Sequence, residues 1–340
     1  MRELKAAVVG LGLGRHYVAA FADSPAIGRL LVCDTDRERL GQVAAAYPRV
    51  AGAYTDLDAM LERERPDAVA IVTPDPWHRP HVERCAEAGC HLLVTKPLAN
   101  SLEDGRAIIR AAEAYGRTLM VGHERRFRPS AVRIKELLDS GELGETILVQ
   151  ADRVADRRGA HASAPWKATA EGGRTPMISS AIHEIDLIRH FVRRPITSVS
   201  AHRNALGTLE FHGHKTEAAL FSFQGGAIGV VSASYEVHWP RQDANTDITD
   251  EFFRLVASRG VILGGRVSRD GRGGWEDLPV DVPRVVSGIR GCVAAFVRVL
   301  MDGTPAPTSG REAFASMAAA FAVEESAETG RPAVPVSTAF

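Results

Sequence analysis

The chain has 340 residues, of which 45% are hydrophobic and 24% are charged, so it is ordinary for a globular protein with room for two or three domains. Lysine and arginine number 41 against 42 acidic residues, and a formal net charge of -1 provides no general basic field for nucleic acid or a membrane surface. The four cysteines form no CxxC pair and no apolar run is long enough for a membrane helix, so we expect a cytoplasmic protein with reduced cysteines and no metal, nucleic-acid or membrane partner.

The first predicted unit is a strand, a glycine turn and a helix. An apolar strand is predicted at residues 6–9 and a helix at 15–22, and between them stands Gly10-Leu11-Gly12-Leu13-Gly14. This order suits a dinucleotide: the first glycine makes a tight turn, the second lets the backbone approach the pyrophosphate, and the helix offers free amides. The third glycine position of G-x-G-x-x-G holds Arg15 instead. We predict that residues 10–14 bind a cofactor pyrophosphate.

A second strand, at residues 30–33, ends at Asp34. This position is about 20 residues past the turn, where a carboxylate can hold the ribose 2′-hydroxyl of the cofactor. A carboxylate would repel a 2′-phosphate, which favours NAD over NADP. Arg37 and Arg39 lie close enough to weaken that preference, so NADP is the alternative cofactor.

Strands and helices continue to alternate up to Gly122. Strands are predicted at 68–72, 91–94 and 118–121, and helices at 36–47, at 80–88 and after Ser101. This alternation is typical of βαβ units and a parallel sheet, and ligands bind at the carboxyl ends of such strands. We predict an α/β dinucleotide-binding domain over residues 1–122. The strand ends that would converge on the cofactor are Gly10, Asp34, Thr73 and Lys96.

Lys96 follows the buried strand directly and precedes Pro97. The proline fixes its own φ and removes a backbone donor, so the lysine leaves the strand in a defined direction. A solvated loop lysine is the competing interpretation. Its place at a strand end makes Lys96 a candidate active-site residue.

The pattern changes after Gly122. A basic stretch at 123–129 precedes a helix around 134–138, and the β-like segments that follow are 147–154, 196–202, 217–223, 227–235 and 252–263. Gly225-Gly226 between two of them is a hairpin signal. We predict an α+β domain over residues 123–340 with an open, mainly antiparallel sheet. Ser309 and Glu312 begin a last helix, over about 309–329, that we expect to pack back across the domains.

One predicted helix of this half begins at Pro176 and carries reactive side chains. Ser179, His183 and Asp186 stand at i, i+4 and i+7, so they share a face and Asp186 can orient His183. A core histidine with satisfied hydrogen bonds is the competing interpretation. The preceding loop, residues 155–176, is long, as functional loops often are, and it contains Trp166, Lys167 and Gly172-Gly173.

Basic side chains are in modest excess around this loop, which suggests an anionic substrate such as a sugar acid or nucleotide sugar. A solvated surface mixture is the alternative. The residues are Arg153, Arg157, Arg158, Lys167 and Arg174 against Asp152, Asp156 and Glu171.

Together these motifs resemble the Gfo/Idh/MocA family of NAD(P)-dependent oxidoreductases, by motif over residues 1–195 and by architecture beyond them. The motifs are the glycine turn, Asp34, Thr73-Pro74-Asp75 with His78, Lys96-Pro97, Arg126-Phe127-Arg128-Pro129, and Gly172-Gly173 leading to His183-Glu184-Ile185-Asp186. The resemblance implies a Rossmann domain, a sheet used for substrate binding and oligomerisation, and sugar, cyclitol or nucleotide-sugar substrates. It also implies that Lys96 and His183 lie beside the nicotinamide and that the Lys96-Pro97 bond can be cis.

Three positions depart from the family pattern. Thr95 stands where the family commonly has glutamate, Ser179 where it often has aspartate, and Asp75 where it usually has asparagine. The first two leave the assignment of proton transfer open.

Hydride transfer at a carbinol carbon requires a group that takes or gives the hydroxyl proton. A free lysine, with a pKa of about 10.4, is too basic for this at neutral pH unless its pKa is lowered, whereas histidine titrates near about 6.5. Our hypothesis is that His183 moves the proton, oriented by Asp186, while Lys96 hydrogen-bonds the reacting oxygen. The reverse assignment of these two roles stays open. Ser179 could relay a proton or bind an adjacent hydroxyl.

The sequence thus predicts an NAD(P)-dependent oxidoreductase that moves a hydride between nicotinamide and a secondary alcohol or ketone of a sugar, cyclitol or sugar derivative. The alternatives are a non-catalytic NAD(P)- or sugar-sensing protein and an enzyme with a transient internal redox step, as in oxidation and elimination on a glycoside. An open sheet favours a homodimer or homotetramer. The predicted cofactor residues are 10–14, Asp34, Thr73, Pro74, Asp75, His78, Thr95, Lys96 and Pro97, and the predicted substrate residues are Lys96, Arg126, Trp166, Lys167, Ser179 and His183.

Overall fold

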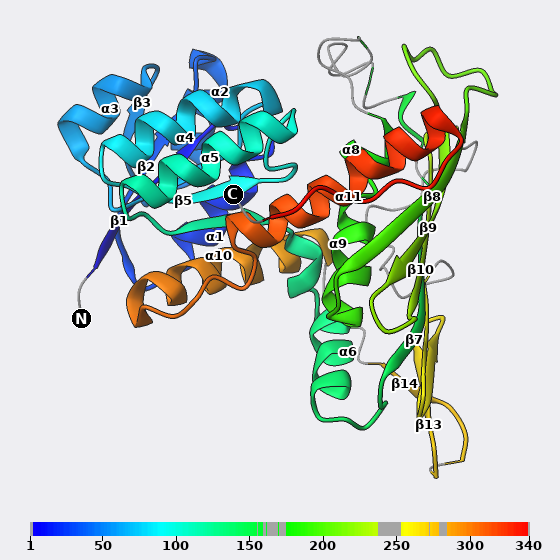
Figure 1. Cartoon of the computed structure of the whole chain (residues 1–340). Coiled ribbons are helices and arrows are strands. Elements are labelled where there is room, and N and C mark those ends of the chain that lie inside the picture. Colours follow the sequence, from blue (N-terminus) through cyan, green and yellow to red (C-terminus); the bar gives the residue numbers. More distant parts are fainter. Residues whose placement is uncertain are drawn as a thin grey trace. The chain divides into compact units, whose positions relative to one another are not determined.

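The computed structural model describes residues 3–154, 156–158, 161, 169, 175–236, 253–271, 273–278 and 284–338. The chain divides into two compact units (Figure 1). Unit 1 contains residues 1–124 and 286–314, and unit 2 contains residues 125–285 and 315–339. Unit 1 is therefore discontinuous in sequence.

Unit 1 contains a six-stranded sheet in the order β3-β2-β1-β4-β5-β6, and all of its strand pairs are parallel. The strands are β1 Leu4–Val9, β2 Ile27–Cys33, β3 Val50–Tyr54, β4 Ala68–Ile71, β5 His91–Thr95 and β6 Leu119–Gly122. All residues of β4 and β6 are buried, as expected for a parallel sheet covered on both faces. The predicted parallel sheet is confirmed.

Helices flank this sheet (Figure 1). They are α1 Arg15–Ala22, α2 Arg37–Ala46, α3 Leu57–Glu64, η1 Asp75–Trp77, α4 His78–Glu87, α5 Leu102–Ala114 and α10 Arg284–Asp302. Ser101 caps α5 by accepting a hydrogen bond from the Asp104 amide at 3.0 Å, so the predicted start of this helix is confirmed.

Unit 2 contains an eight-stranded sheet in the order β14-β13-β12-β11-β7-β10-β9-β8. Its strands are β7 Thr146–Val154, β8 Ile196–Asn204, β9 Thr216–Phe223, β10 Ile228–Ser234, β11 Phe253–Ala257, β12 Gly260–Leu263, β13 Arg266–Arg269 and β14 Glu276–Asp277. Among the strands that the structure describes in this sheet, only β7 and β10 pair in parallel, so the predicted mainly antiparallel sheet is confirmed. Gly225 and Gly226 form the predicted hairpin turn with φ values of 86° and 92°.

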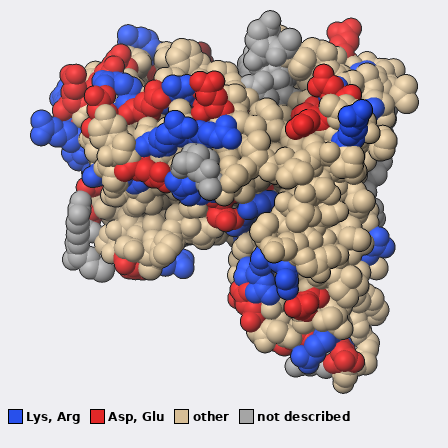
Figure 2. Space-filling model, viewed as in Figure 1, with Lys and Arg blue, Asp and Glu red and all other residues tan. Residues whose placement is uncertain are grey.

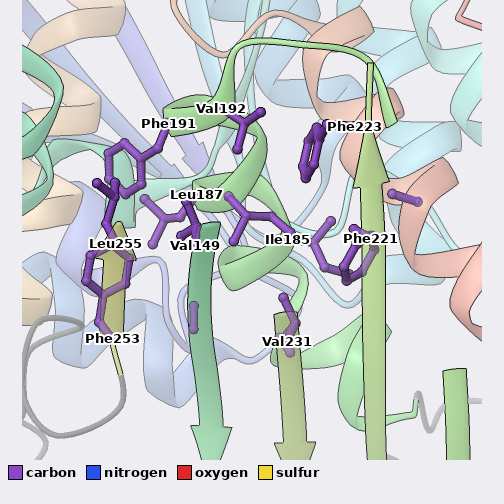
Figure 3. Packing of buried hydrophobic residues seen from close by; sticks show 14 of the residues in the cluster. Val149, Ile185, Leu187, Phe191, Val192, Phe221, Phe223, Val231, Phe253 and Leu255 are labelled. Atoms are coloured by element: carbon purple, nitrogen blue, oxygen red, sulfur yellow. The ribbon is translucent and has the colours of Figure 1, made fainter. Parts of the chain in front are cut away.

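Helix α9 (Ile182–Val192) packs on the inner face of this sheet. Figure 3 shows Ile185, Leu187 and Phe191 of the helix among side chains from β7, β9, β10 and β11. The remaining helical elements of unit 2 are η2 Glu124–Phe127, α6 Pro129–Asp139, α8 Pro176–Ser179 and most of α11 Gly310–Thr329. Alternate residues of β9, β10 and β11 are buried in the core, and the residues between them lie on the other face of the sheet.

Two predicted elements are wrong as stated. The helix expected to run on from Pro176 ends at Ser179, because the amides of Ser180 and Ala181 both donate to the Pro176 carbonyl, and α9 then begins at Ile182. Ser179 and His183 therefore belong to different helices. The strand expected over 252–263 is a hairpin of β11 and β12, with Ser258 and Arg259 at its turn, and Phe252 lies outside the described residues.

The cysteines Cys33, Cys85, Cys90 and Cys292 are buried free thiols, as predicted. Within the described ranges, no helix combines the length and hydropathy needed to cross a membrane. Figure 2 shows acidic and basic side chains interspersed on the visible face of each unit, in keeping with the near-zero net charge.

Candidate functional site

The three glycines of the first turn differ in the space around them. Gly10 has a φ of +85°, and a Cβ built on it would lie 2.7 Å from the Val72 carbonyl oxygen. A Cβ on Gly12 would meet no other atom within 4 Å, whereas a Cβ on Gly14 would lie 1.9 Å from the Gly10 carbonyl oxygen. Gly14 thus provides the close helix packing usually provided by the third glycine of the motif, and Gly12 leaves its backbone open to a ligand.

The amino end of α1 suits an anion. Its N-cap, Gly14, makes no side-chain capping bond, and its first turn contains no acidic residue. Burial, and then the charge of Arg15, lower the pKa of His16. The positive dipole end of the helix is therefore not neutralised by the first turn, as a pyrophosphate site requires.

Asp34 connects the glycine turn to the end of β2. Its carboxylate is buried, and it accepts hydrogen bonds from the Leu11 amide at 2.6 Å and the Asp36 amide at 2.9 Å. The guanidinium of Arg39 lies 3.4 Å from the same carboxylate. The structure therefore brings the predicted pyrophosphate and ribose residues together.

The ends of β4 and β5 are linked by His78. This side chain is fully buried, with Nε2 3.0 Å from the Thr73 carbonyl oxygen and Nδ1 3.0 Å from the Pro97 carbonyl oxygen. His78 thus holds the two strand-end segments in place from inside the protein. Asp75 lies in the η1 turn that follows Thr73 and Pro74.

Lys96 is partly buried immediately after β5, and the Lys96-Pro97 peptide bond is cis, as the resemblance implied. The neighbouring Thr95 is buried and forms a side-chain hydrogen bond with Tyr17 of α1. Burial raises the pKa of Tyr17 well above its ordinary value, so its hydroxyl stays protonated. Thr95, in the place of the family's glutamate, therefore connects β5 to α1.

In unit 2, Asp186 is held by two residues distant in sequence. Arg126 Nε donates to one carboxylate oxygen at 2.5 Å and Nη2 to the other at 2.6 Å, and Ser316 Oγ of α11 donates at 2.9 Å. All three side chains are buried. This bidentate pair fixes α9 to η2 and α11, and His183 lies buried one turn before Asp186 on α9.

Ser179 lies at the end of α8 and forms a side-chain hydrogen bond with Tyr235, which follows β10. The Tyr235 hydroxyl also donates to the Thr175 carbonyl at 3.3 Å, and the guanidinium of Arg157 lies 5.5 Å from the ring centroid. Sequence reasoning missed Tyr235, although an aromatic residue closing the alternating segment 227–235 was a usable signal. Trp166 and Lys167 lie outside the described residues.

Two family models match the chain. One, described as an oxidoreductase family with an NAD-binding Rossmann fold, matches residues 4–123, and the other, the GFO/IDH/MocA C-terminal domain, matches residues 131–263. Among curated relatives, the scyllo-inositol 2-dehydrogenase (NAD(+)) of Bacillus subtilis is 32% identical over 237 residues, which are 68% of this chain and 67% of that protein. The D-apiose dehydrogenase of Paraburkholderia graminis is 26% identical over 346 residues, which are 97% of this chain and 89% of that protein.

A solved structure shares the fold across both units. The oxidoreductase from Agrobacterium radiobacter in complex with NAD+, L-tartaric acid and magnesium has a TM-score of 0.87 at 23% identity, and the match covers 98% of each chain. The fold, the glycine turn with Asp34, and both family models agree with the resemblance in the sequence. The chain belongs to the Gfo/Idh/MocA family of oxidoreductases, with an NAD-binding Rossmann domain at its amino-terminal end.

Proposed function

We propose that this protein is an NAD-dependent dehydrogenase that acts on a secondary hydroxyl group, or the corresponding ketone, of a sugar, cyclitol or sugar derivative. The observation that carries the proposal is the open backbone at Gly12 next to a buried Asp34, which is bonded to the Leu11 amide. Relatives named inositol 2-dehydrogenase, D-apiose dehydrogenase and D-glucoside 3-dehydrogenase support the substrate class.

The proposed cofactor site follows the strand ends of unit 1. Residues 10–14 would bind the pyrophosphate, Asp34 the adenosine ribose, and residues 73–75 and 95–97 the rest of the dinucleotide. When bound, NAD accepts or supplies a hydride at its nicotinamide ring. His78 has both ring nitrogens against main-chain carbonyls, so its proposed role is to position these segments.

For the proton, we assign general base catalysis to His183 and hydrogen bonding of the reacting oxygen to Lys96. The reverse assignment differs in one respect that can be measured, namely which variant loses the pH dependence of turnover. Asp186 is already paired with Arg126 and Ser316, so we propose that it acts through α9 and positions His183 rather than moving a proton itself. Arg126 shares this positioning role.

Ser179 is proposed to contact the substrate next to the reacting hydroxyl, with Tyr235 setting its orientation through their side-chain hydrogen bond. Trp166 and Lys167 remain predicted substrate residues. A tryptophan suits a sugar face, and a lysine suits a hydroxyl or an anionic substituent.

The proposal can be tested by incubating the purified protein with NAD and a panel of inositols, aldoses, glucosides and sugar acids. A dehydrogenase produces absorbance of reduced nicotinamide with at least one of them. A sensing protein of the same fold binds NAD but gives no absorbance change with any member. An enzyme with an internal redox step retains NAD through dialysis and converts a glycoside without net reduced cofactor.

We also propose that the protein is a homodimer or homotetramer that associates through the outer face of the unit 2 sheet. Leu220 on β9 is 46% exposed and Ile228 on β10 is 39% exposed. Ile228 pairs with Leu148 in register, and Leu148 pairs with Val256. Val256, Leu148 and Ile228 thus form an apolar row across three adjacent strands, and Leu220 lies beside this row, opposite Val230. Such a face is a common site of self-association.

A further inference from the structure

The carboxyl end of β7 carries a basic side chain on the face of the sheet that packs against α9. Val149 and Ala151 of β7 are buried in the core under α9. Side chains alternate along a strand, so Arg153 has the same orientation as these two residues. Arg153 therefore lies on the α9 side of the sheet, beyond the last core residue of its strand.

The charges around Arg153 do not balance. Arg125 forms an ion pair with one oxygen of Glu184, which is 2% exposed. The other oxygen has no hydrogen-bond partner among the residues that the structure describes. Arg157 donates to a neutral acceptor, the Ser180 hydroxyl. Arg153 forms no hydrogen bond or ion pair with any residue that the structure describes, and its Nε is buried. Among the described residues, the guanidinium groups of Arg125, Arg153 and Arg157 thus have one carboxylate near them, that of Glu184.

The pKa of Arg153 reflects this surplus. It is lowered to about 9, first by the charge of Arg125, then by burial, with Arg157 and Arg128 adding to the effect and Glu184 opposing it. Arg153 is still charged at neutral pH with this pKa. Like charges gathered in a partly buried place destabilise a fold unless a counter-charge joins them.

The amino end of α9 adds further positive charge beside Glu184. Helix α9 begins at Ile182, and its N-cap Ala181 provides no side-chain cap, so the positive dipole end of the helix is close to Glu184 in the first turn. In sequence, residues 159–174 carry Lys167 and Arg174 against Glu171 and bring no net negative charge. Residues 237–252 carry four acidic residues in sequence, and thermal unfolding of the variants tests whether these supply a counter-charge: Asp243, Asp247, Asp250 and Glu251.

We propose that Arg153, with Arg125 and Arg157 beside it, binds an oxyanion carried by the substrate, either a carboxylate or a phosphate. A guanidinium binds both groups through two parallel hydrogen bonds, which a lysine cannot reproduce. The assignment of the oxyanion to the substrate rests on the proposed function, whereas binding of the oxyanion does not. The substrate class is then a sugar acid or a sugar phosphate rather than a neutral polyol.

The test is thermal unfolding of the full-length protein with glucuronate, glucose 6-phosphate or neutral glucose, at constant ionic strength. The variant is Arg153→Met, which removes the charge and keeps a flexible, unbranched apolar stem. The control is Arg254→Met, because Arg254 is an exposed arginine of the neighbouring β11 that donates to Gln150 at 2.8 Å. Both variants lose one positive charge.

We expect at least one anionic sugar to raise the Tm of the wild type and of Arg254→Met, and to have no effect on Arg153→Met. Glucose should change none of them. The anion that acts distinguishes a carboxylate from a phosphate. Without ligand, Arg153→Met should melt above the wild type, because a repulsive charge is gone. If Arg153→Met does not fold, Arg153→Lys can be used, since it keeps the charge but lacks the two parallel N–H donors of a guanidinium. We expect this variant to bind the anion at least about tenfold more weakly.

Equal responses of the wild type and Arg153→Met would overturn the proposal. The proposal would also be overturned if ligand-free Arg153→Met had a lower Tm than the wild type and no anion changed the Tm of the wild type. That result would show that acidic residues of the chain itself neutralise the charge of Arg153. Anion binding without reduced nicotinamide from any substrate would leave this site in place and remove the proposed function. Turnover of neutral polyols, with no change in Tm on addition of an anion, would support the proposed function and rule out the oxyanion site.

Discussion

Substitution of alanine at two positions of the glycine turn should have different consequences. Gly14→Ala would place a methyl group 1.9 Å from the Gly10 carbonyl oxygen, and this is a main-chain atom that cannot move aside. We expect a loss of about 1–3 kcal/mol in the free energy of unfolding, as for overpacking elsewhere. Gly12→Ala has open space and should leave stability unchanged but weaken NAD binding. Denaturant unfolding and NAD titration of both variants check this, and similar stabilities would contradict it.

Asp34 should decide between NAD and NADP. Its carboxylate is buried at the turn, and Arg39 at 3.4 Å is already placed to receive a 2′-phosphate once the carboxylate is gone. Asp34→Ser should lower the ratio of kcat/KM for NAD over NADP at least about tenfold.

Asp36→Ser is the matched control for this change. Asp36 also pairs with Arg39, at 3.1 Å, but it caps α2. Serine can replace that cap at a cost of less than about 1 kcal/mol, so this variant should keep the wild-type cofactor preference. If Asp34→Ser kept the wild-type preference for NAD over NADP, Asp34 would not be the residue that binds the ribose 2′-hydroxyl.

At the scale of elements, the start of α8 depends on a buried carboxyl group. Glu217 of β9 is fully buried and accepts a hydrogen bond from the Met177 amide at 2.7 Å. Burial first, and then the neighbouring Glu324, raise the pKa of Glu217 to about 9. Glu324 in turn accepts a hydrogen bond from Thr175 and pairs with Arg203 at 3.2 Å. Glu217 is thus neutral at pH 7 in the folded protein.

This raised pKa predicts a pH-dependent stability. The folded value of about 9 lies above the ordinary 4.5, so the stabilisation is full below pH 4.5 and is lost as the pH rises from there through about 9. Glu217→Gln mimics the neutral carboxyl group and should raise the Tm at pH 9 while changing it little at pH 5. Glu325→Gln, an exposed neighbour of Glu324, should change neither. A constant difference from pH 5 to 9 would contradict this account.

Much of the architecture followed from local patterns. The strand ends at Gly10, Asp34, Thr73 and Lys96 were predictable because parallel strands end at one edge and each apolar run is short and clear. The strand β3 was not predicted, since it is only partly buried, is centred on Gly52 and lacks a strong apolar run.

The parts that sequence could not provide depend on contacts between distant residues. The helix break after Ser179 coincides with bonds from Arg157 to Ser180 and between Ser179 and Tyr235, which no local periodicity reveals. The pairing of Arg126 with Asp186 likewise joins residues 60 positions apart. Periodicity placed Asp186 on the correct helix but could not identify its partner.

At the scale of the whole molecule, the outer face of the unit 2 sheet predicts self-association. Leu220→Lys combined with Ile228→Lys should reduce the mass measured by light scattering to that of one chain, because two charges would enter an apolar interface. Both side chains lie on the outer face and outside the core, so the two substitutions should change the Tm of the protein little. Ala45→Lys, which adds a charge at an exposed position of α2 in unit 1, is the control. A wild type that is already monomeric would refute the expected oligomer.

The proposed activity assigns one role to Lys96, which belongs to unit 1, and one to His183, which belongs to unit 2. The most direct test is the turnover number of Lys96→Ala and His183→Ala with a substrate found in the panel, together with their affinities for NAD. His202→Ala, which removes an exposed histidine of β8, is the control.

We predict that each of the two variants loses turnover at least about tenfold, and up to the 10²–10⁴ typical of acid–base groups, while binding NAD like the wild type. The pH dependence of turnover should disappear in His183→Ala. Wild-type turnover in both variants, with NAD bound, would contradict the assignment of this site.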